Sequence, residues 1–84
     1  MPRNERRPVE FSVHAKDRLD LRGVEEDEAR AIVRTGAWRP DGVGRFGEPK
    51  WIAHGSIRGQ WIDIVFVETT MGTIEVLWVL TVTV

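Results

Sequence analysis

The stretch KWIAHGSIRGQWIDIVFVE, residues 50–68, holds two runs of strand length on either side of the dipeptide Arg58-Gly59. Both runs are rich in tryptophan and β-branched residues, which are typical of strands. A glycine that takes a positive φ suits a two-residue hairpin loop. We therefore predict an antiparallel hairpin that sets His54 directly opposite Asp63.

A third strand-length segment, IEVLWVLTV, follows, and the turn before it is ambiguous. A two-residue loop at Met71-Gly72 would set Glu68 opposite Glu75, and like charges in that position destabilise a sheet. A three-residue loop that begins at Thr70 avoids this by pairing Glu68 with Ile74, and we predict this loop.

These registers divide the strand side chains between two faces. The face expected to lie under the helices carries Trp51, Ala53, Ile57, Ile62, Ile64, Phe66, Ile74, Val76, Trp78 and Leu80. The opposite face carries Lys50, Ile52, His54, Ser56, Trp61, Asp63, Val65, Glu75, Leu77, Val79, Thr81 and Thr83. Because the second face mixes charges, hydroxyls and an imidazole, we expect it to be the functional or interface surface.

The segment FSVHAKDRLDLRGV, residues 11–24, predicts a helix over about 13–22, with Ser12 as its N-cap and Gly23 as its left-handed stop. A second helix is expected over about 25–35, because its acidic first turn suits the positive end of the helix dipole. A metal site in that acidic cluster is the alternative.

Two helices followed by a β-meander predict an α+β domain, with two N-terminal helices packed on a three- to four-stranded antiparallel sheet. The glycine-rich connector GVGRFGEP allows one short edge strand near 43–47. Residues 1–8, with three arginines and two prolines, are expected to form a flexible basic tail before a single domain over 9–84.

Composition narrows the possible functions. The chain has 84 residues, no cysteine and a formal net charge of −1, so thiolate zinc sites and cysteine nucleophiles are excluded. No apolar run is long enough to span a bilayer, and the N-terminus lacks the apolar core of a signal peptide. We therefore expect a soluble cytoplasmic protein. There is no phosphate loop, metal-ligand spacing or dinucleotide fingerprint, so no cofactor or metal is expected.

The remaining reactive groups are those that metal-independent cleavage of RNA requires. Histidine can transfer protons near neutral pH, and arginine matches phosphate oxygens with two N–H groups. The candidate catalytic residues are His14, Arg18, His54 and Lys50. The candidate RNA-binding residues are Arg22, Arg45, Arg58 and Trp61.

Each candidate has a structural alternative. The alternative for His14 is a helix-surface histidine hydrogen-bonded to the N-terminal tail, and the alternative for His54 and Asp63 is a solvated cross-strand pair. Arg18 and Arg22 suit ion pairing with neighbouring acids or the C-terminal end of the helix dipole. The alternative role of Trp61 is packing rather than base stacking. The alternative for Lys50, Arg45 and Arg58 is that they are surface charges at the hairpins that keep the protein soluble.

The run HAKDRLDLRGVEEDEARAIVRTG resembles the opening of the bacterial family called domain of unknown function 4258. The matching positions are His14, Ala15, Arg18, Arg22, Gly23 and Val24, together with the closing VLWVLTVTV. That family is similar to compact RelE/ParE- and colicin-type ribonuclease toxins, so the resemblance implies a RelE/barnase-like fold. It also implies a first-helix histidine in the active site. The chain contains no tyrosine, which excludes a tyrosine-based site.

Two hypotheses follow. The first is an endoribonuclease toxin of a bacterial toxin–antitoxin or contact-dependent inhibition system, which would act on mRNA or tRNA and be held by an antitoxin or immunity protein. The second is a non-catalytic interaction module or homodimer. Its basis is the last strand, which has no charge after Glu75 and would favour self-association if it lay at a sheet edge.

Overall fold

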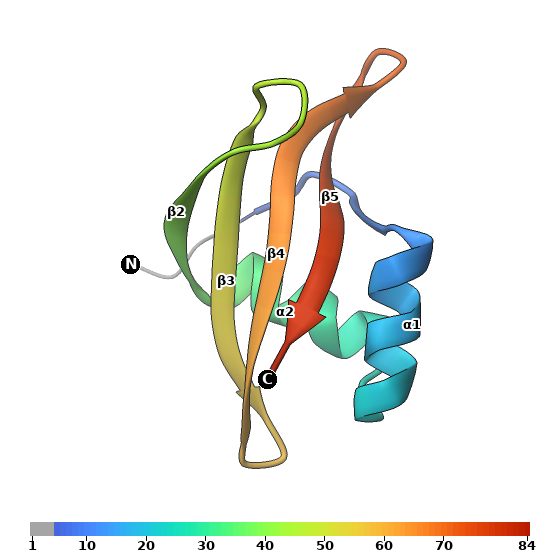
Figure 1. Ribbon diagram of the computed structural model, residues 1–84, viewed down its shortest axis with the longest axis vertical. Coiled ribbons are helices and arrows are strands. Elements are labelled where there is room, and N and C mark those ends of the chain that lie inside the picture. Colours follow the sequence, from blue (N-terminus) through green and yellow to red (C-terminus); the bar gives the residue numbers. More distant parts are fainter. Residues whose placement is uncertain (1–4) are drawn as a thin grey trace.

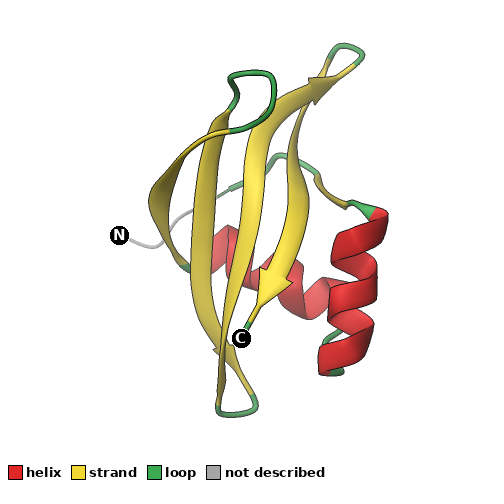
Figure 2. Cartoon of the chain, in the orientation of Figure 1, coloured by secondary structure: helices red, strands yellow, loops and turns green. Residues whose placement is uncertain are grey.

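The computed structural model of the chain describes residues 5–84, which form a five-stranded sheet with two helices (Figures 1 and 2). The elements in chain order are β1 (Val9–Phe11), α1 (Val13–Arg22), α2 (Glu26–Thr35), β2 (Ala37–Val43), β3 (Pro49–Ile57), β4 (Gln60–Met71) and β5 (Ile74–Thr83). The strand order is β1-β5-β4-β3-β2. Helix α2 covers one face of the sheet, and α1 lies alongside β5 (Figure 1). We call the face opposite α2 the open face.

Both helices begin and end for local reasons, as the sequence predicts. The Ser12 side chain accepts a hydrogen bond from the Ala15 N–H at 3.0 Å, and Gly23 is left-handed with φ 66°. Helix α2 starts with a capping box in which the Glu25 and Glu28 side chains bond reciprocally to the backbone. The acidic cluster therefore serves as a helix start.

The β3–β4 hairpin has the predicted register. Ile57 pairs with Gln60 and His54 with Asp63. Arg58 and Gly59 both have positive φ, at 51° and 78°, which is the requirement of a type I′ turn.

The predicted β4–β5 turn is wrong. Met71 pairs with Ile74, so the loop is Gly72-Thr73, and Glu68 lies opposite Leu77 rather than Ile74. The left-handed Gly72, with φ 64°, comes first in the loop instead of last. The like-charge pair is avoided in this register too.

This shift moves the side chains of β5 to the other face of the sheet. A bulge between Val65 and Phe66 of β4 further leaves Leu80 without a partner, so the alternation reverses past it. The β5 residues in the core are therefore Leu77, Val79 and Val82, whereas Trp78 and Leu80 lie on the open face.

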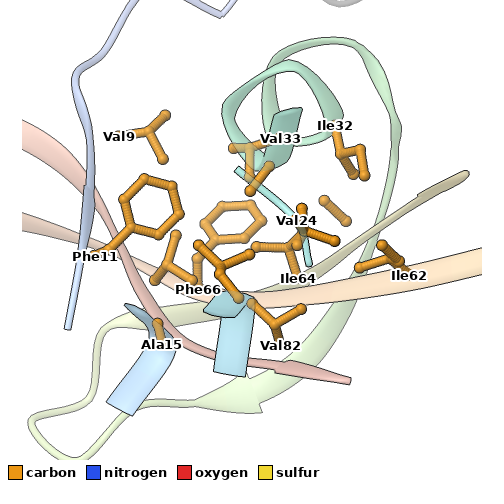
Figure 3. Packing of buried hydrophobic residues seen from close by; sticks show 14 of the residues in the cluster. Val9, Phe11, Ala15, Val24, Ile32, Val33, Ile62, Ile64, Phe66 and Val82 are labelled. Carbon is orange, nitrogen blue, oxygen red and sulfur yellow. The ribbon is translucent and has the colours of Figure 1, made fainter. Parts of the chain in front are cut away.

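The core lies between α2, α1 and the covered face of the sheet. Its largest fully buried side chain is Phe66 of β4, and Figure 3 shows Val9 and Phe11 pointing into the same cluster from β1. Trp38 of β2 packs edge-on against Phe66, with ring centroids 4.7 Å apart. Strands β1 and β2 thus both contribute to the core.

The α+β class with two helices on the sheet is confirmed, and β2–β5 form an antiparallel four-stranded part as predicted. The whole sheet differs in being mixed and five-stranded. Strand β1 pairs in parallel with β5, with Val9 opposite Leu77. It was missed because three residues are too few for an alternation to identify a strand, although Val9 and Phe11 are buried and Glu10 is exposed. The edge strand expected near 43–47 lies at 37–43 instead, and the segment after it is a turn closed by the Gly44 N–H and the Glu48 carbonyl at 2.8 Å.

The last strand does not meet the condition for self-association, because it does not lie at a sheet edge. Strand β5 lies between β4 and β1, and α1 runs beside the rest of it. The edge strands are the three-residue β1 and β2, and Pro40 of β2 lacks an N–H to offer a partner strand.

Residues 1–4 of the expected basic tail lie outside the described residues, but residues 5–8 contact the domain. Arg7 donates to Glu5 at 2.7 Å and to Glu68 at 2.6 Å, and the Pro8 carbonyl accepts from the Leu77 N–H at 2.8 Å. Hydrogen bonding to Arg7 lowers the pKa of Glu5 to about 2 and lowers that of Glu68. Within residues 5–84, no helix is long and apolar enough to cross a membrane.

Candidate active site

The open face carries the polar side chains that the β3–β4 register predicts. Residues directly opposite each other in an antiparallel pair share a face. His54 and Asp63 are opposite each other, and Thr83 of β5 is the next partner in the same row. The next row of cross-strand partners on this face begins at Arg39 of β2 and ends at Thr81 of β5.

The centre of this face is a hydrogen-bonded pair. The Nδ1 atom of His54 lies 2.5 Å from Oδ1 of Asp63, and the other carboxylate oxygen lies 3.4 Å from the Arg39 guanidinium. An ionised carboxylate can only accept, so Nδ1 donates and Nε2 of His54 carries the lone pair in the neutral ring. The pair is reachable, because the His54 side chain is 43% exposed.

The Trp61 indole stacks on the face of the His54 imidazole. The His54 and Trp61 rings are stacked, with centroids 4.7 Å apart and planes within 6°. Trp61 itself is 61% exposed, so its other face is open to solvent. The Asp63 hydrogen bond and this stack together fix the orientation of the His54 ring.

This arrangement suits proton transfer. A histidine oriented by a carboxylate through one ring nitrogen can take or give a proton through the other. Among residues 5–84, Nε2 of His54 has no hydrogen-bond partner and is available to a bound molecule. Arg39 supplies a positive charge on the same face.

His14 lies at the rim where α1 meets the sheet. Its Nε2 atom is 3.1 Å from the Thr81 hydroxyl, and the side chain is exposed. Thr81 is separated from β3 by two strand spacings, about 10 Å. The structure thus places His14 and His54 on one face without bringing them into contact.

The two arginines of α1 make no polar contact in the part of the chain that the structure describes. Arg18 is half-buried, one helical turn after His14, and Arg22 is exposed in the last turn. Both guanidiniums are therefore available to an anion, and Arg18 is near enough to His14 to share one.

The other predicted cations differ in their surroundings. Lys50 lies 3.6 Å from Asp41 on the open face, in the row next to that of Arg39. The Arg58 guanidinium already has two partners in the fold: it donates to the Glu28 carboxylate at 2.5 Å and to the Gly23 carbonyl at 2.7 Å. Arg58 thereby fastens the β3–β4 hairpin to the start of α2.

The pKa of Glu28 is lowered by its bond to the Glu25 N–H and by Arg58. Arg45 lies in the β2–β3 loop beside a cavity described below.

Arg39 is the member of the central cluster that the sequence analysis missed. Pro40 and Gly42 kept residues 37–43 from being assigned as a strand. The signal that could have placed it is Trp38, since a large aromatic residue is expected to pack on the core. If Trp38 faces the core, its neighbour Arg39 must face the open side.

No group of three or more histidine, aspartate or glutamate side chains within residues 5–84 is placed to hold a metal ion. Comparison of the chain with models of protein families, with curated proteins and with solved structures finds no match.

Proposed function

We propose that this chain is a metal-independent endoribonuclease, with a RelE/barnase-like arrangement of helices and sheet, that acts as a toxin in a bacterial toxin–antitoxin or contact-dependent inhibition system. The observation that carries the proposal is the His54 imidazole, which is oriented by Asp63, stacked on Trp61 and open to solvent at Nε2. The resemblance of residues 14–24 to domain of unknown function 4258 supports the same class.

In this mechanism Nε2 of His54 takes the proton of the RNA 2′-hydroxyl. The 2′-oxygen then attacks phosphorus, the bond to the 5′-oxygen breaks, and a 2′,3′-cyclic phosphate forms. The departing 5′-oxygen takes its proton from water, because His14 lies too far away to donate it. Arg39 and Lys50 offset the negative charge that builds up on the phosphoryl oxygens.

His14 and Arg18 have a second role in the proposal. Nε2 of His14 already contacts the Thr81 hydroxyl. We therefore assign His14 and Arg18 to binding a neighbouring phosphate of the same RNA strand. Arg22 extends that contact at the end of α1. RNA, specifically mRNA or tRNA, is the proposed substrate, and an antitoxin or immunity protein that covers the open face is the proposed partner.

The experiment that tests this proposal is digestion of RNA by the purified protein in EDTA. His54→Ala should abolish cleavage, whereas Ser56→Ala, an exposed neighbour on the same strand, should leave it unchanged. His14→Ala should weaken RNA binding more than it slows the chemical step. In cells, His54→Ala should restore growth if the wild-type chain is toxic.

The alternative is a non-catalytic interaction module or homodimer of the same fold. Several apolar side chains that are exposed at one end of the sheet favour it: Val43, Phe46, Met71 and Ile74. The same assay, combined with the mass of the protein in solution, separates the two. A stable dimer that leaves RNA intact would replace the nuclease proposal with this one.

A further inference from the structure

The open face contains a second feature, a cavity of about 540 Å³ at the end of the sheet away from the β3–β4 hairpin. The β2–β3 loop and the β4–β5 hairpin both project at that end (Figure 1). The cavity is lined mainly by Arg45, Phe46, Val67, Met71, Trp78 and Leu80. Its volume falls within the range of small-ligand sites.

Two aromatic side chains from different elements line this cavity. Trp78 of β5 is half-buried, whereas Phe46 in the β2–β3 loop is 84% exposed. The loop nonetheless has internal hydrogen bonds that fix its shape. The Phe46 N–H donates to the Glu48 carboxylate at 2.8 Å, and the Gly47 N–H donates to the Gly44 carbonyl at 3.1 Å. The hydrogen-bonded loop keeps the Phe46 ring exposed to water, which is unfavourable for an apolar group. A ligand that covered the ring would remove this unfavourable free energy.

The charges around the cavity are mixed: Arg45 and Glu48 both line it, and the Glu48 carboxylate accepts from the Phe46 N–H. Arg45 lines the cavity and has no hydrogen-bond or ion-pair partner among the described residues. Lys50 lies opposite Val67, which lines the cavity floor, and its contact with Asp41 is loose at 3.6 Å. Lys50 lies on the side of the cavity that leads back toward His54, whereas Arg45 lies in the β2–β3 loop at the end of the sheet.

The separation between the cavity and the candidate active site suits one strand of nucleic acid. Asp63 and Val67 are four residues apart on β4 and face the same side, so the two sites are about 13 Å apart. We infer that the cavity binds a nucleobase of single-stranded RNA whose phosphodiester lies at His54 and whose backbone passes Lys50.

This inference rests on the proposed ribonuclease function and adds a base-binding subsite to it. Phe46 and Trp78 supply the stacking faces, because every base has a flat π surface that an aromatic side chain can cover. The hydroxyls of Thr69 and Thr70 also line the cavity and can bond to base edges. The subsite makes cleavage depend on single-stranded RNA that extends beyond the scissile bond.

The test uses 2′-O-methyl oligonucleotides, which lack the hydroxyl that the cleavage reaction requires. The wild-type protein should bind a tetranucleotide more tightly than a dinucleotide, which cannot reach both sites. Phe46→Ala should weaken tetranucleotide binding about tenfold and leave dinucleotide binding unchanged. Phe46→Trp should retain the affinity.

Val43→Ala is the matched control, because Val43 is 67% exposed near the same loop and does not line the cavity. Equal tetranucleotide affinity of the wild-type protein and Phe46→Ala would overturn the inference, and so would failure of the wild-type protein to bind the tetranucleotide. Concentration-dependent dimerisation that Phe46→Ala removes, with RNA affinity unchanged, would assign the cavity to a protein partner instead.

Cleavage assays keep this result separate from the proposed function. If His54→Ala abolishes cleavage while Phe46→Ala binds normally, the nuclease proposal stands and the subsite falls. If no variant cleaves RNA but Phe46→Ala still weakens binding, the subsite stands as a binding site and the nuclease proposal falls.

Discussion

The imidazole of His54 lies flat on the indole of Trp61, with the ring centroids 4.7 Å apart and 6° between the planes. The two residues are diagonal neighbours, since His54 pairs with Asp63 and Trp61 with Ser56 in the β3–β4 hairpin. Such diagonal contacts are within reach of aromatic side chains. The hairpin therefore orients the candidate base with a ring stack as well as with a hydrogen bond.

Replacing Trp61 should release the His54 ring without unfolding the domain. Trp61 is 61% exposed, so Trp61→Ala removes little core packing. The proton resonances of the His54 ring should move downfield as the indole ring current disappears, and any ribonuclease activity should fall about tenfold as the base loses its orientation. Two-dimensional NMR of the imidazole checks the first effect, and RNA digestion checks the second.

Trp61→Phe and Gln60→Ala are the controls for this change. Phenylalanine keeps an aromatic face, so much of the upfield shift should remain, and Gln60→Ala changes an exposed neighbour that lies outside the stack. His54 resonances that are the same in Trp61→Ala and in the wild-type protein would show that the two rings do not stack in solution.

The features that sequence reasoning predicted correctly are those determined by neighbouring residues. The N-cap at Ser12, the stop at Gly23 and the Arg58-Gly59 hairpin each depend on a few consecutive positions. The hairpin register in turn placed His54 opposite Asp63, which is the centre of the candidate site.

The features that were predicted wrongly depend on distant contacts. The β5 register could not be read from alternation, because apolar side chains occupy both of its faces and a bulge at Leu80 reverses the pattern. Strand β1 is defined only by its pairing with β5. Arg39 was not predicted as a site residue because Pro40 argued against a strand at residues 37–43. That strand is stabilised by its pairing with β3.

Gly55 of β3 leaves no room for a side chain beneath Ile32 of α2. A Cβ atom added at Gly55 would lie 2.9 Å from Cγ1 and 3.1 Å from Cγ2 of Ile32, both on a stiff β-branched side chain. Gly55→Ala should therefore lower the free energy of unfolding by about 1–3 kcal/mol through overpacking. Chemical denaturation followed by tryptophan fluorescence measures this change.

Two further variants make the Gly55 prediction specific. Ser56→Ala changes the exposed next residue and should alter stability by less than about 0.5 kcal/mol. Because Ile32→Ala makes room for the new methyl group, its combination with Gly55→Ala should cost less than the two single changes added together. Strict additivity would argue against the Ile32 contact.

The short strand β1 should contribute to stability in spite of its length. Val9 is 1% exposed and packs in the core, whereas Glu10, its neighbour on the same strand, is exposed. Val9→Ala should cost about 2 kcal/mol, from two lost methyl groups and the cavity they leave. That cost corresponds to a fall in Tm of roughly 8–16 °C for a domain of this size.

Glu10→Ala serves as the control for β1, because it truncates an exposed side chain and keeps the strand. Its Tm should stay within a few degrees of the wild-type value. If Val9→Ala also left the Tm unchanged, residues 9–11 would not be docked against β5 in solution.

The ion pairs that hold residues 5–8 to the sheet should make stability depend on pH in the acid range. The pKa of Glu5 falls from its ordinary 4.5 to about 2, mainly through its hydrogen bond to Arg7, and that of Glu68 is lowered chiefly by the same guanidinium. A carboxyl with a depressed pKa in the folded state stabilises the fold fully above its unfolded pKa. That stabilisation is lost as the pH falls toward the folded pKa.

The wild-type protein should therefore lose stability between about pH 4.5 and pH 2, and Arg7→Met should flatten that part of the profile. At pH 7 the variant should be less stable by about 1 kcal/mol, the size expected for partly exposed ion pairs. Arg6→Met removes the same charge one residue earlier, from an exposed side chain without an ion pair among the described residues. Equal acid profiles for Arg7→Met and Arg6→Met, measured by thermal unfolding from pH 2 to pH 7, would show that Arg7 does not hold the two glutamates.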